Sequence, residues 1–208
     1  MLGCSAGAEV YSILWTIRSA RPDLKVVLHA VDISKEILNF AERGVYEPST
    51  CAVVGSSIFE LTTNEKRGMF DWEGDQAKVK SWIREGIIWK IGDAADPEFI
   101  SVLGFQDIVV ASNFLCHMAP VDAEECLRNI TRLVGPGGHL LVSGVDLDVR
   151  TKVALDLGWK PMPALLAEIH DGDPCVRADW PCAWWGLEPL DQRRPDWLMR
   201  YASAFQVN

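Results

Sequence analysis

Residues 3–9 of the chain read GCSAGAE, a glycine-rich stretch directly ahead of a helical pattern. Glycines in such a loop let backbone N–H groups approach a ligand, and the helix that follows directs its positive N-terminal end at that ligand. The stretch is typical of a strand-to-helix turn that binds a nucleotide-like cofactor. Only Met1 and Leu2 precede it, whereas a buried strand usually has about 5–6 residues. We therefore expect the first strand of the sheet to be largely missing, and the sequence to be a fragment or an alternatively started form.

Apolar runs and helical periodicities alternate along the chain after this loop. Such alternation predicts an α/β fold with a parallel sheet and right-handed crossovers. We expect strands at Lys25–Val31, Gly86–Asp93, Gln106–Asn113 and His139–Val145. We expect helices at Ala8–Ala20, Ser34–Arg43, Asp75–Glu85, Asp96–Gly104 and Asp122–Val134, the last closed by the glycines of GPGG. The pattern weakens after Asp148, where helices are expected at Thr151–Gly158, Pro163–His170 and Pro195–Phe205.

The length of 208 residues is enough for one sizeable core, so we expect a single domain over residues 1–208. Residues 1–144 form its cofactor-binding core, residues 145–208 a divergent C-terminal part, and residues 45–74 an irregular insertion over the sheet edge.

The composition argues against several classes of partner and site. A net charge of -9 disfavours binding to nucleic acid or to an anionic membrane surface. The six cysteines include no C-x-x-C pair and the four histidines are far apart, so neither a disulfide framework nor a metal site is indicated. The chain has neither an apolar run long enough to span a membrane nor a visible secretory signal, and a cytoplasmic location is the expectation.

Polar residues stand where the predicted strands end. Ligands of an open parallel sheet lie across the carboxyl ends of its strands, which here are occupied by the glycine loop, Asp32, Asp93 and the pair Ser112-Asn113. The two oxygens of Asp32 suit the two hydroxyls of a ribose. Glu9 within the loop would repel a pyrophosphate but attract an ammonium group. This favours S-adenosyl-L-methionine over a dinucleotide.

The same residues carry a resemblance to a known family. The motifs GCSAGAEVYS, VDIS followed by AERGVY, the DA after the third strand, NFLCHM and LVGPGGHLLVSG resemble the CheR-type chemotaxis receptor methyltransferases. These are protein-glutamate O-methyltransferases of the Rossmann-like class that uses S-adenosyl-L-methionine. The resemblance covers roughly Met1 to Gly144.

The resemblance implies a role for each candidate site residue. Glu9 would contact the methionyl part of the cofactor, Asp32 the ribose, and Asp93 with Ala94 the adenine, while Ser112 and Asn113 would lie near the cofactor too. The full set of expected cofactor-binding residues is Gly3, Ser5, Gly7, Glu9, Asp32, Ile33, Asp93, Ala94, Ser112 and Asn113.

The acceptor is less constrained than the cofactor. A glutamate acceptor is already anionic at neutral pH, since its ordinary pKa is about 4.3, so no catalytic base is required and none is assigned. An amine or phenol acceptor would need a base, for which His117 is the first candidate. The sequence departs from the family pattern at Ala8, at Ser112 and at residues 116–118, and VDLDVRTK replaces the usual GHSE ending.

Three functions therefore remain open. They are methylation of a protein carboxylate of a chemoreceptor, methylation of a small molecule, and binding without catalysis. The tryptophans Trp180, Trp184 and Trp185 are interpreted as packing, with a lid or an acceptor wall as the alternative.

Overall fold

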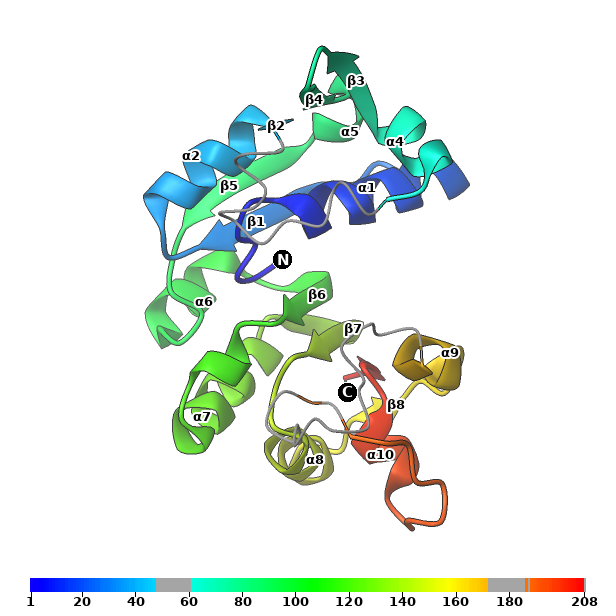
Figure 1. The fold of residues 1–208 in the computed structure, drawn as a ribbon. Coiled ribbons are helices and arrows are strands. Elements are labelled where there is room, and N and C mark those ends of the chain that lie inside the picture. The colour runs from blue at the N-terminus through cyan, green and yellow to red at the C-terminus, as the bar shows by residue number, and fades with distance from the viewer. Residues whose placement is uncertain (48–60, 172–185, 187, 208) are drawn as a thin grey trace. The chain divides into compact units, whose positions relative to one another are not determined.

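The computed structural model describes residues 1–47, 61–171, 186 and 188–207 (Figure 1). The described chain divides into two compact units, one made of Met1 and Gly3–Asp93 and the other of Leu2 and Ala94–Asn208. Each combines helices with strands, and the fold is the mixed α/β, Rossmann-like type that the sequence predicts.

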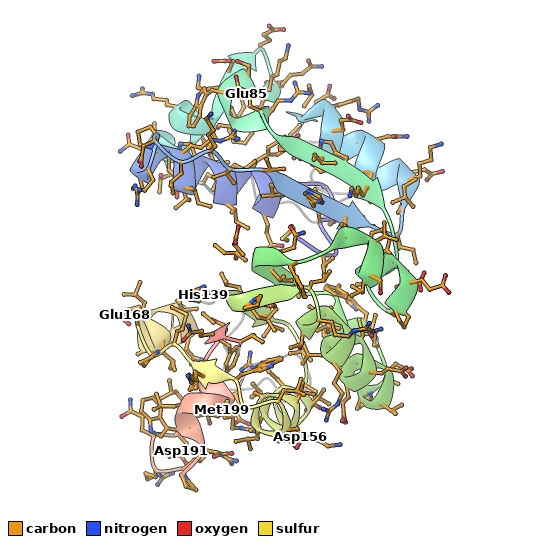
Figure 2. The ribbon with its side chains drawn as sticks, turned by 180° about the vertical axis from the view of Figure 1, so that it is seen from behind. Glu85, His139, Asp156, Glu168, Asp191 and Met199 are labelled. Atoms are coloured by element: carbon orange, nitrogen blue, oxygen red, sulfur yellow. The ribbon has the colours of Figure 1, made fainter. Side chains whose placement is uncertain are left out.

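The first unit contains a parallel strand pair and a small antiparallel sheet. Strands β1 and β5 run parallel with Asp32 beside Ile91, and strands β2, β4 and β3 form the antiparallel sheet in that order. The elements of this unit are α1 (Ala8–Ala20), β1 (Leu28–Asp32), α2 (Lys35–Arg43), β2 (Val45–Tyr46), α4 (Thr63–Met69), β3 (Phe70–Glu73), β4 (Gln76–Val79), α5 (Ser81–Arg84) and β5 (Ile87–Ile91). Arg18 of α1 ties its helix to the C-terminal end of α5 by donating to the carbonyls of Ile83 and of the C-cap Glu85, which is labelled in Figure 2.

The second unit is built on β6 and β7, which run parallel. Strand β9 pairs antiparallel with β7, and β8 pairs with β9. Its elements are α6 (Pro97–Leu103), β6 (Gln106–Ser112), the 3-10 turn η2 (Leu115–His117), α7 (Pro120–Thr131), β7 (Val134–Ser143), α8 (Leu147–Asp156), β8 (Lys160–Pro161), α9 (Leu166–Asp171), α10 (Trp197–Tyr201) and β9 (Ala204–Gln206). Helices α7 and α8 are joined by Arg128, which donates to Asp156 at the end of α8 (Figure 2).

The residues ahead of the glycine loop make single-residue strand pairings. In the first unit the Met1 nitrogen donates to the His29 carbonyl and the Met1 carbonyl accepts from the Val31 N–H, both at 2.9 Å. In the second unit Leu2 forms an isolated parallel bridge with Ala111. Of these two residues only Leu2 forms a bridge, and it is an isolated one.

Four sequence-based expectations about secondary structure are wrong. The helix expected at Asp75–Glu85 is strand β4 followed by the short helix α5, because Gly74, with φ +61°, closes a two-residue hairpin turn after β3. The burial of β4 alternates along the strand, which a helix would not do.

The second correction concerns the GPGG segment, which belongs to strand β7 and does not separate it from α7. The register between β6 and β7 shifts between Gln106 and Ile108, and the extra residues of β7 lie in this irregularity. A Cβ on Gly138 would come within 2.9 Å of the Asp107 carbonyl, so a glycine is required there.

The third correction concerns the C-terminus, where the expected helix Pro195–Phe205 ends at Tyr201. The chain then extends into β9, whose Phe205 is fully buried beside Leu140 of β7. The fourth correction concerns the insertion expected to be irregular over residues 45–74, whose described parts form β2, α4 and β3. Residues 48–60 of that insertion and the tryptophans at 180, 184 and 185 lie outside the described residues.

Candidate functional site

The glycine loop has an unusual backbone. Gly3, Ser5 and Gly7 have φ values of +62°, +46° and +82°. Glycine adopts these angles at little cost, whereas a serine in this region is strained and must be stabilised by its surroundings. The Ser5 N–H donates to Asp32 Oδ2 at 2.8 Å, which supplies such a contact. Ser5, the strained residue of the loop, therefore links the loop to the end of β1.

Asp32 is oriented by two backbone donors. Its Oδ2 accepts from Ser5 and its Oδ1 accepts from the Ser34 N–H at 3.0 Å. A carboxylate oxygen can accept two hydrogen bonds, so one backbone donor leaves each Asp32 oxygen with capacity for another. The side chain is half-buried at the carboxyl end of β1. Asp32 is thus fixed in direction and able to accept bonds from a pair of hydroxyl groups.

Asp93 and Ile33 lie at the same edge of the first unit. The parallel register sets Asp32 beside Ile91, and the Gly92 N–H donates to the Asp32 carbonyl at 3.0 Å, so Asp93 follows immediately beyond the end of β5. Ile33, directly after β1, is 70% exposed, so its apolar side chain is accessible to a ligand. This edge combines a fixed carboxylate, a second acidic residue and an apolar surface suited to an aromatic ring.

The loop continues into the N-terminus of α1. Gly7 is the N-cap of α1 and has no side chain that could cap the helix. Glu9 is exposed in the first helical turn. A Cβ on Gly7 would come within 3.0 Å of Ala41 Cβ and 3.2 Å of the Trp89 ring, so Gly7 is required for space as well as for φ. The first turn of a helix offers backbone N–H groups without intrahelical partners, a general site for ligand acceptors.

Two tyrosines that the sequence did not single out support this loop. The Tyr46 hydroxyl donates to the Ala6 carbonyl at 2.7 Å, and the Tyr11 hydroxyl donates to the Ala41 carbonyl at 2.6 Å. Both side chains are essentially fully buried, and their rings meet edge to face at 6.4 Å. Tyr46 ends the AERGVY motif, so the signal was present, but the partner of its hydroxyl depends on the tertiary fold.

Cys4 within the loop is a buried thiol. Burial, and next the negative charge of Asp32, raise the pKa of Cys4 to about 12. The thiolate that a nucleophile would need is therefore negligible at neutral pH. Cys4, Cys116 and Cys126 are buried free cysteines, in agreement with their interpretation as small core residues.

The second unit carries the remaining candidates. Ser112 ends β6 opposite Ser143, and Asn113 follows with φ +56° while its N–H donates to the Ser143 carbonyl at 3.1 Å. A Cβ on Gly144 would lie 2.6 Å from the Asn113 Cα, so the two turns after β6 and β7 are in close backbone contact. Ala94 is buried, and His117 is exposed at the end of η2.

The structure thus brings the predicted residues together in two groups. The first unit holds Gly3, Ser5, Gly7, Glu9, Asp32, Ile33 and Asp93, and the second holds Ala94, Ser112 and Asn113. Within residues 1–47, 61–171, 186 and 188–207, no three His, Cys, Asp or Glu side chains are placed to bind a metal ion. Over the same ranges no helix has the length and apolar character needed to cross a bilayer.

Comparison with known proteins places this geometry in a family. The family model described as CheR methyltransferase, SAM binding domain, matches residues 1–149. Chemotaxis protein methyltransferase 1 of Vibrio cholerae serotype O1 (strain ATCC 39315 / El Tor Inaba N16961) is 29% identical over 148 residues, which are 68% of this chain and 51% of that protein. An uncharacterized 104.1 kDa protein in the hypE 3' region of Rhodobacter capsulatus is 26% identical over 157 residues, 72% of this chain and 15% of that protein.

The chain therefore spans about half the length of the first relative and a small part of the second. Among solved structures, a TehB-like SAM-dependent methyltransferase from Corynebacterium glutamicum ATCC 13032 Kitasato is similar with a TM-score of 0.46 and 15% identity, covering 77% of this chain and 64% of that one. The family match extends over residues 1–149 of 208, and the chain accordingly belongs to the CheR methyltransferase SAM-binding domain family, whose cofactor is S-adenosyl-L-methionine.

Proposed function

We propose that the chain acts as a methyltransferase toward a protein glutamate carboxylate, with residues 1–208 as one catalytic domain. The observation that carries the proposal is the orientation of Asp32 by the Ser5 and Ser34 N–H groups beside a glycine loop in the left-handed conformation. A carboxylate fixed by two backbone donors, with a lone pair left on each oxygen, is suited to the ribose of a nucleoside cofactor.

The remaining cofactor contacts follow from position. Glu9 would face the ammonium group of the methionyl part, and Ile33 with Asp93 and Ala94 would border the adenine. Gly3, Ser5 and Gly7 shape the loop that approaches the cofactor, while Ser112 and Asn113 would lie near its methionyl part. When bound, S-adenosyl-L-methionine supplies an electrophilic methyl group on a sulfonium.

The chain's own residues need not move a proton for a carboxylate acceptor. The acceptor oxygen is anionic at neutral pH, so the protein's task is to bind, align and exclude water. Within the described residues of the loop, the one thiol, Cys4, is held protonated. This agrees with a site that works by positioning.

The test is methyl transfer from cofactor labelled in its methyl group to a fragment of a chemoreceptor. We expect the label to enter the fragment and to be released as volatile methanol by mild alkali, because a carboxyl methyl ester is hydrolysed under these conditions. A label that is stable to alkali would contradict a carboxylate acceptor.

Two further results would identify the alternatives. Label found only in small molecules of a cell extract would favour the small-molecule acceptor that the departures from the family pattern allow. Binding of S-adenosylhomocysteine without transfer to either class would indicate a silent binding module.

A further inference from the structure

A charged cluster in the second unit joins Asp148, at the end of the range that the family model matches, to residues beyond that range. Arg200 of α10 is 5% exposed, and its guanidinium donates to both carboxylate oxygens of Glu188, at 2.5 and 2.9 Å, and to Asp148 at 2.6 Å. The Tyr201 hydroxyl donates to Glu188 at 2.8 Å, and the Glu188 carbonyl lies 2.8 Å from His170 Nε2. Figure 2 labels Met199, which lies in α10 directly before Arg200. Glu188 is therefore held through its side chain and its backbone.

Gly186, close to this cluster in the sequence, lies against the turn that follows β7. Gly186 lies two residues before Glu188 and has φ +80°. A Cβ on Gly186 would come within 2.9 Å of the Val145 carbonyl and 3.5 Å of the Gly144 nitrogen. Only glycine can bring the backbone this close, so residue 186 rests directly on the Gly144–Val145 turn.

The Gly144–Val145 turn packs against Asn113. Gly144, with φ +58°, has room for no side chain, because a Cβ would lie 2.6 Å from the Asn113 Cα. The Gly144 carbonyl accepts from the Cys116 N–H at 2.9 Å, and the Ser143 carbonyl accepts from the Asn113 N–H at 3.1 Å. At the carboxyl ends of β6 and β7 the Gly144–Val145 turn is thus in close contact with both Asn113 and Gly186.

We propose that Glu188 and Arg200 are positioning residues, which press Gly186 onto the Gly144–Val145 turn and so set the backbone of Asn113 for the transfer reaction. The contacts of Gly186 and Asn113 with this turn are observed in the structure; their effect on transfer rests on the proposed function. In an open sheet the carboxyl ends of the strands form the ligand edge, so a shift of this turn moves the groups that line it. The C-terminal residues would then contribute to the site without touching the reacting atoms.

The first variant acts on the contact with this turn directly. Gly186→Ala adds a methyl group that must push Val145 away, whereas Gly158→Ala is its matched control, since Gly158 has φ +66° and no atom within 4 Å of an added Cβ. Both substitutions place an alanine in the left-handed backbone region, but only Gly186→Ala disturbs the contact with the Gly144–Val145 turn. Glu188→Gln removes the charge that orders Arg200 and is the second variant.

The primary readout is amide hydrogen exchange, which requires no ligand. We expect exchange at the Asn113 and Cys116 amides to accelerate about tenfold in Gly186→Ala and Glu188→Gln, with the Leu133 amide unchanged as the reference. Gly158→Ala should leave all three unchanged. Equal exchange at Asn113 and Cys116 in Gly186→Ala and Gly158→Ala would overturn the proposal.

The second readout separates positioning from simple destabilisation. We expect kcat for transfer to fall about tenfold in Gly186→Ala and Glu188→Gln, because a small displacement of positioned groups costs rate, with the Kd for S-adenosylhomocysteine changed less than about threefold. Unchanged kcat alongside faster exchange would overturn the role in transfer. Absence of transfer by the unaltered chain would instead count against the proposed function. The exchange result would still show whether Glu188 and Gly186 hold the Asn113 backbone in place.

Discussion

Asp32 and Glu188 are two carboxylates that the fold fixes in opposite ways. Asp32 accepts one backbone N–H on each oxygen and is half-buried at the end of β1, so each oxygen can take a further bond from a ligand. Glu188 receives the guanidinium of Arg200 on both oxygens and the Tyr201 hydroxyl on one. Backbone donors thus orient the Asp32 carboxylate without supplying a cation, whereas the buried guanidinium of Arg200 pairs with the Glu188 carboxylate and makes it a structural link.

The largest expected effect concerns the structural carboxylate. Arg200→Ala leaves Glu188 and Asp148 without their cation, and we expect the free energy of unfolding to fall by about 3 kcal/mol, the lower range for breaking a buried ion pair. Denaturant unfolding measures it. The matched control is Arg194→Ala, whose pair with Asp196 is at the surface and should contribute less than about 0.5 kcal/mol. A smaller loss of unfolding free energy in Arg200→Ala than in Arg194→Ala would show that the cluster does not stabilise the fold.

The next effect concerns the loop that meets Asp32. Gly7→Ala forces a left-handed alanine against Ala41 and Trp89, and we expect about 2 kcal/mol of lost unfolding free energy together with weaker binding of S-adenosylhomocysteine. Gly74→Ala is the control in the same unit, because it has φ +61° and open space around the added methyl. It should lose only about 1 kcal/mol and leave binding unchanged. Equal binding by both variants would show that the loop conformation does not matter to the ligand.

A smaller effect is expected from Tyr46→Phe, which leaves the buried Ala6 carbonyl without its hydroxyl donor. We expect about 1 kcal/mol of lost stability and a few-fold weaker binding of S-adenosylhomocysteine. Tyr11→Phe is the matched comparison, since its hydroxyl serves Ala41 outside the loop. If both variants lose similar stability but only Tyr46→Phe binds S-adenosylhomocysteine more weakly, the loop is supported from β2. Weaker binding in both variants would contradict this role of Tyr46.

The smallest effect is the pH dependence of the Glu188 link. Hydrogen bonds from Arg200 hold the pKa of Glu188 below its ordinary value of 4.5. The folded state therefore binds this proton less readily than the unfolded state, so the stabilisation is complete above pH 4.5 and is lost as the pH falls through the folded pKa. Unfolding free energies between about pH 3 and 6 should decline less steeply in Glu188→Gln than in the unaltered chain. Parallel pH profiles would contradict the assignment.

The sequence predicts the main parallel strands because their physical signal is local. Apolar runs that end at Asp32 and just before Asp93 match β1 and β5, and QDIVVASN matches β6 closely. The sequence predicts a glycine loop whose backbone approaches a ligand, and in the structure Gly3 and Gly7 have the positive φ values that glycine adopts readily. The binding roles of these residues stay predictions.

Other features depend on partners that are distant in sequence. Strand β9 has only three residues and exists because β7 pairs with it, and β4 was mistaken for a helix because its alternating burial becomes visible only beside β3. The bond from Tyr46 to Ala6 joins residues 40 positions apart, and that from Arg200 to Asp148 spans 52. No periodicity within one segment encodes such contacts.

The central claim is that Asp32 binds the ribose of the cofactor, and calorimetric titration with S-adenosylhomocysteine tests it most directly. Asp32→Ala should weaken binding about 100-fold, or about 2.7 kcal/mol, through the loss of two hydrogen bonds to a charged acceptor. The exposed Asp23, paired with Arg21, provides the control Asp23→Ala, which should bind as the unaltered chain does. Equal affinity of Asp32→Ala and Asp23→Ala would contradict the account.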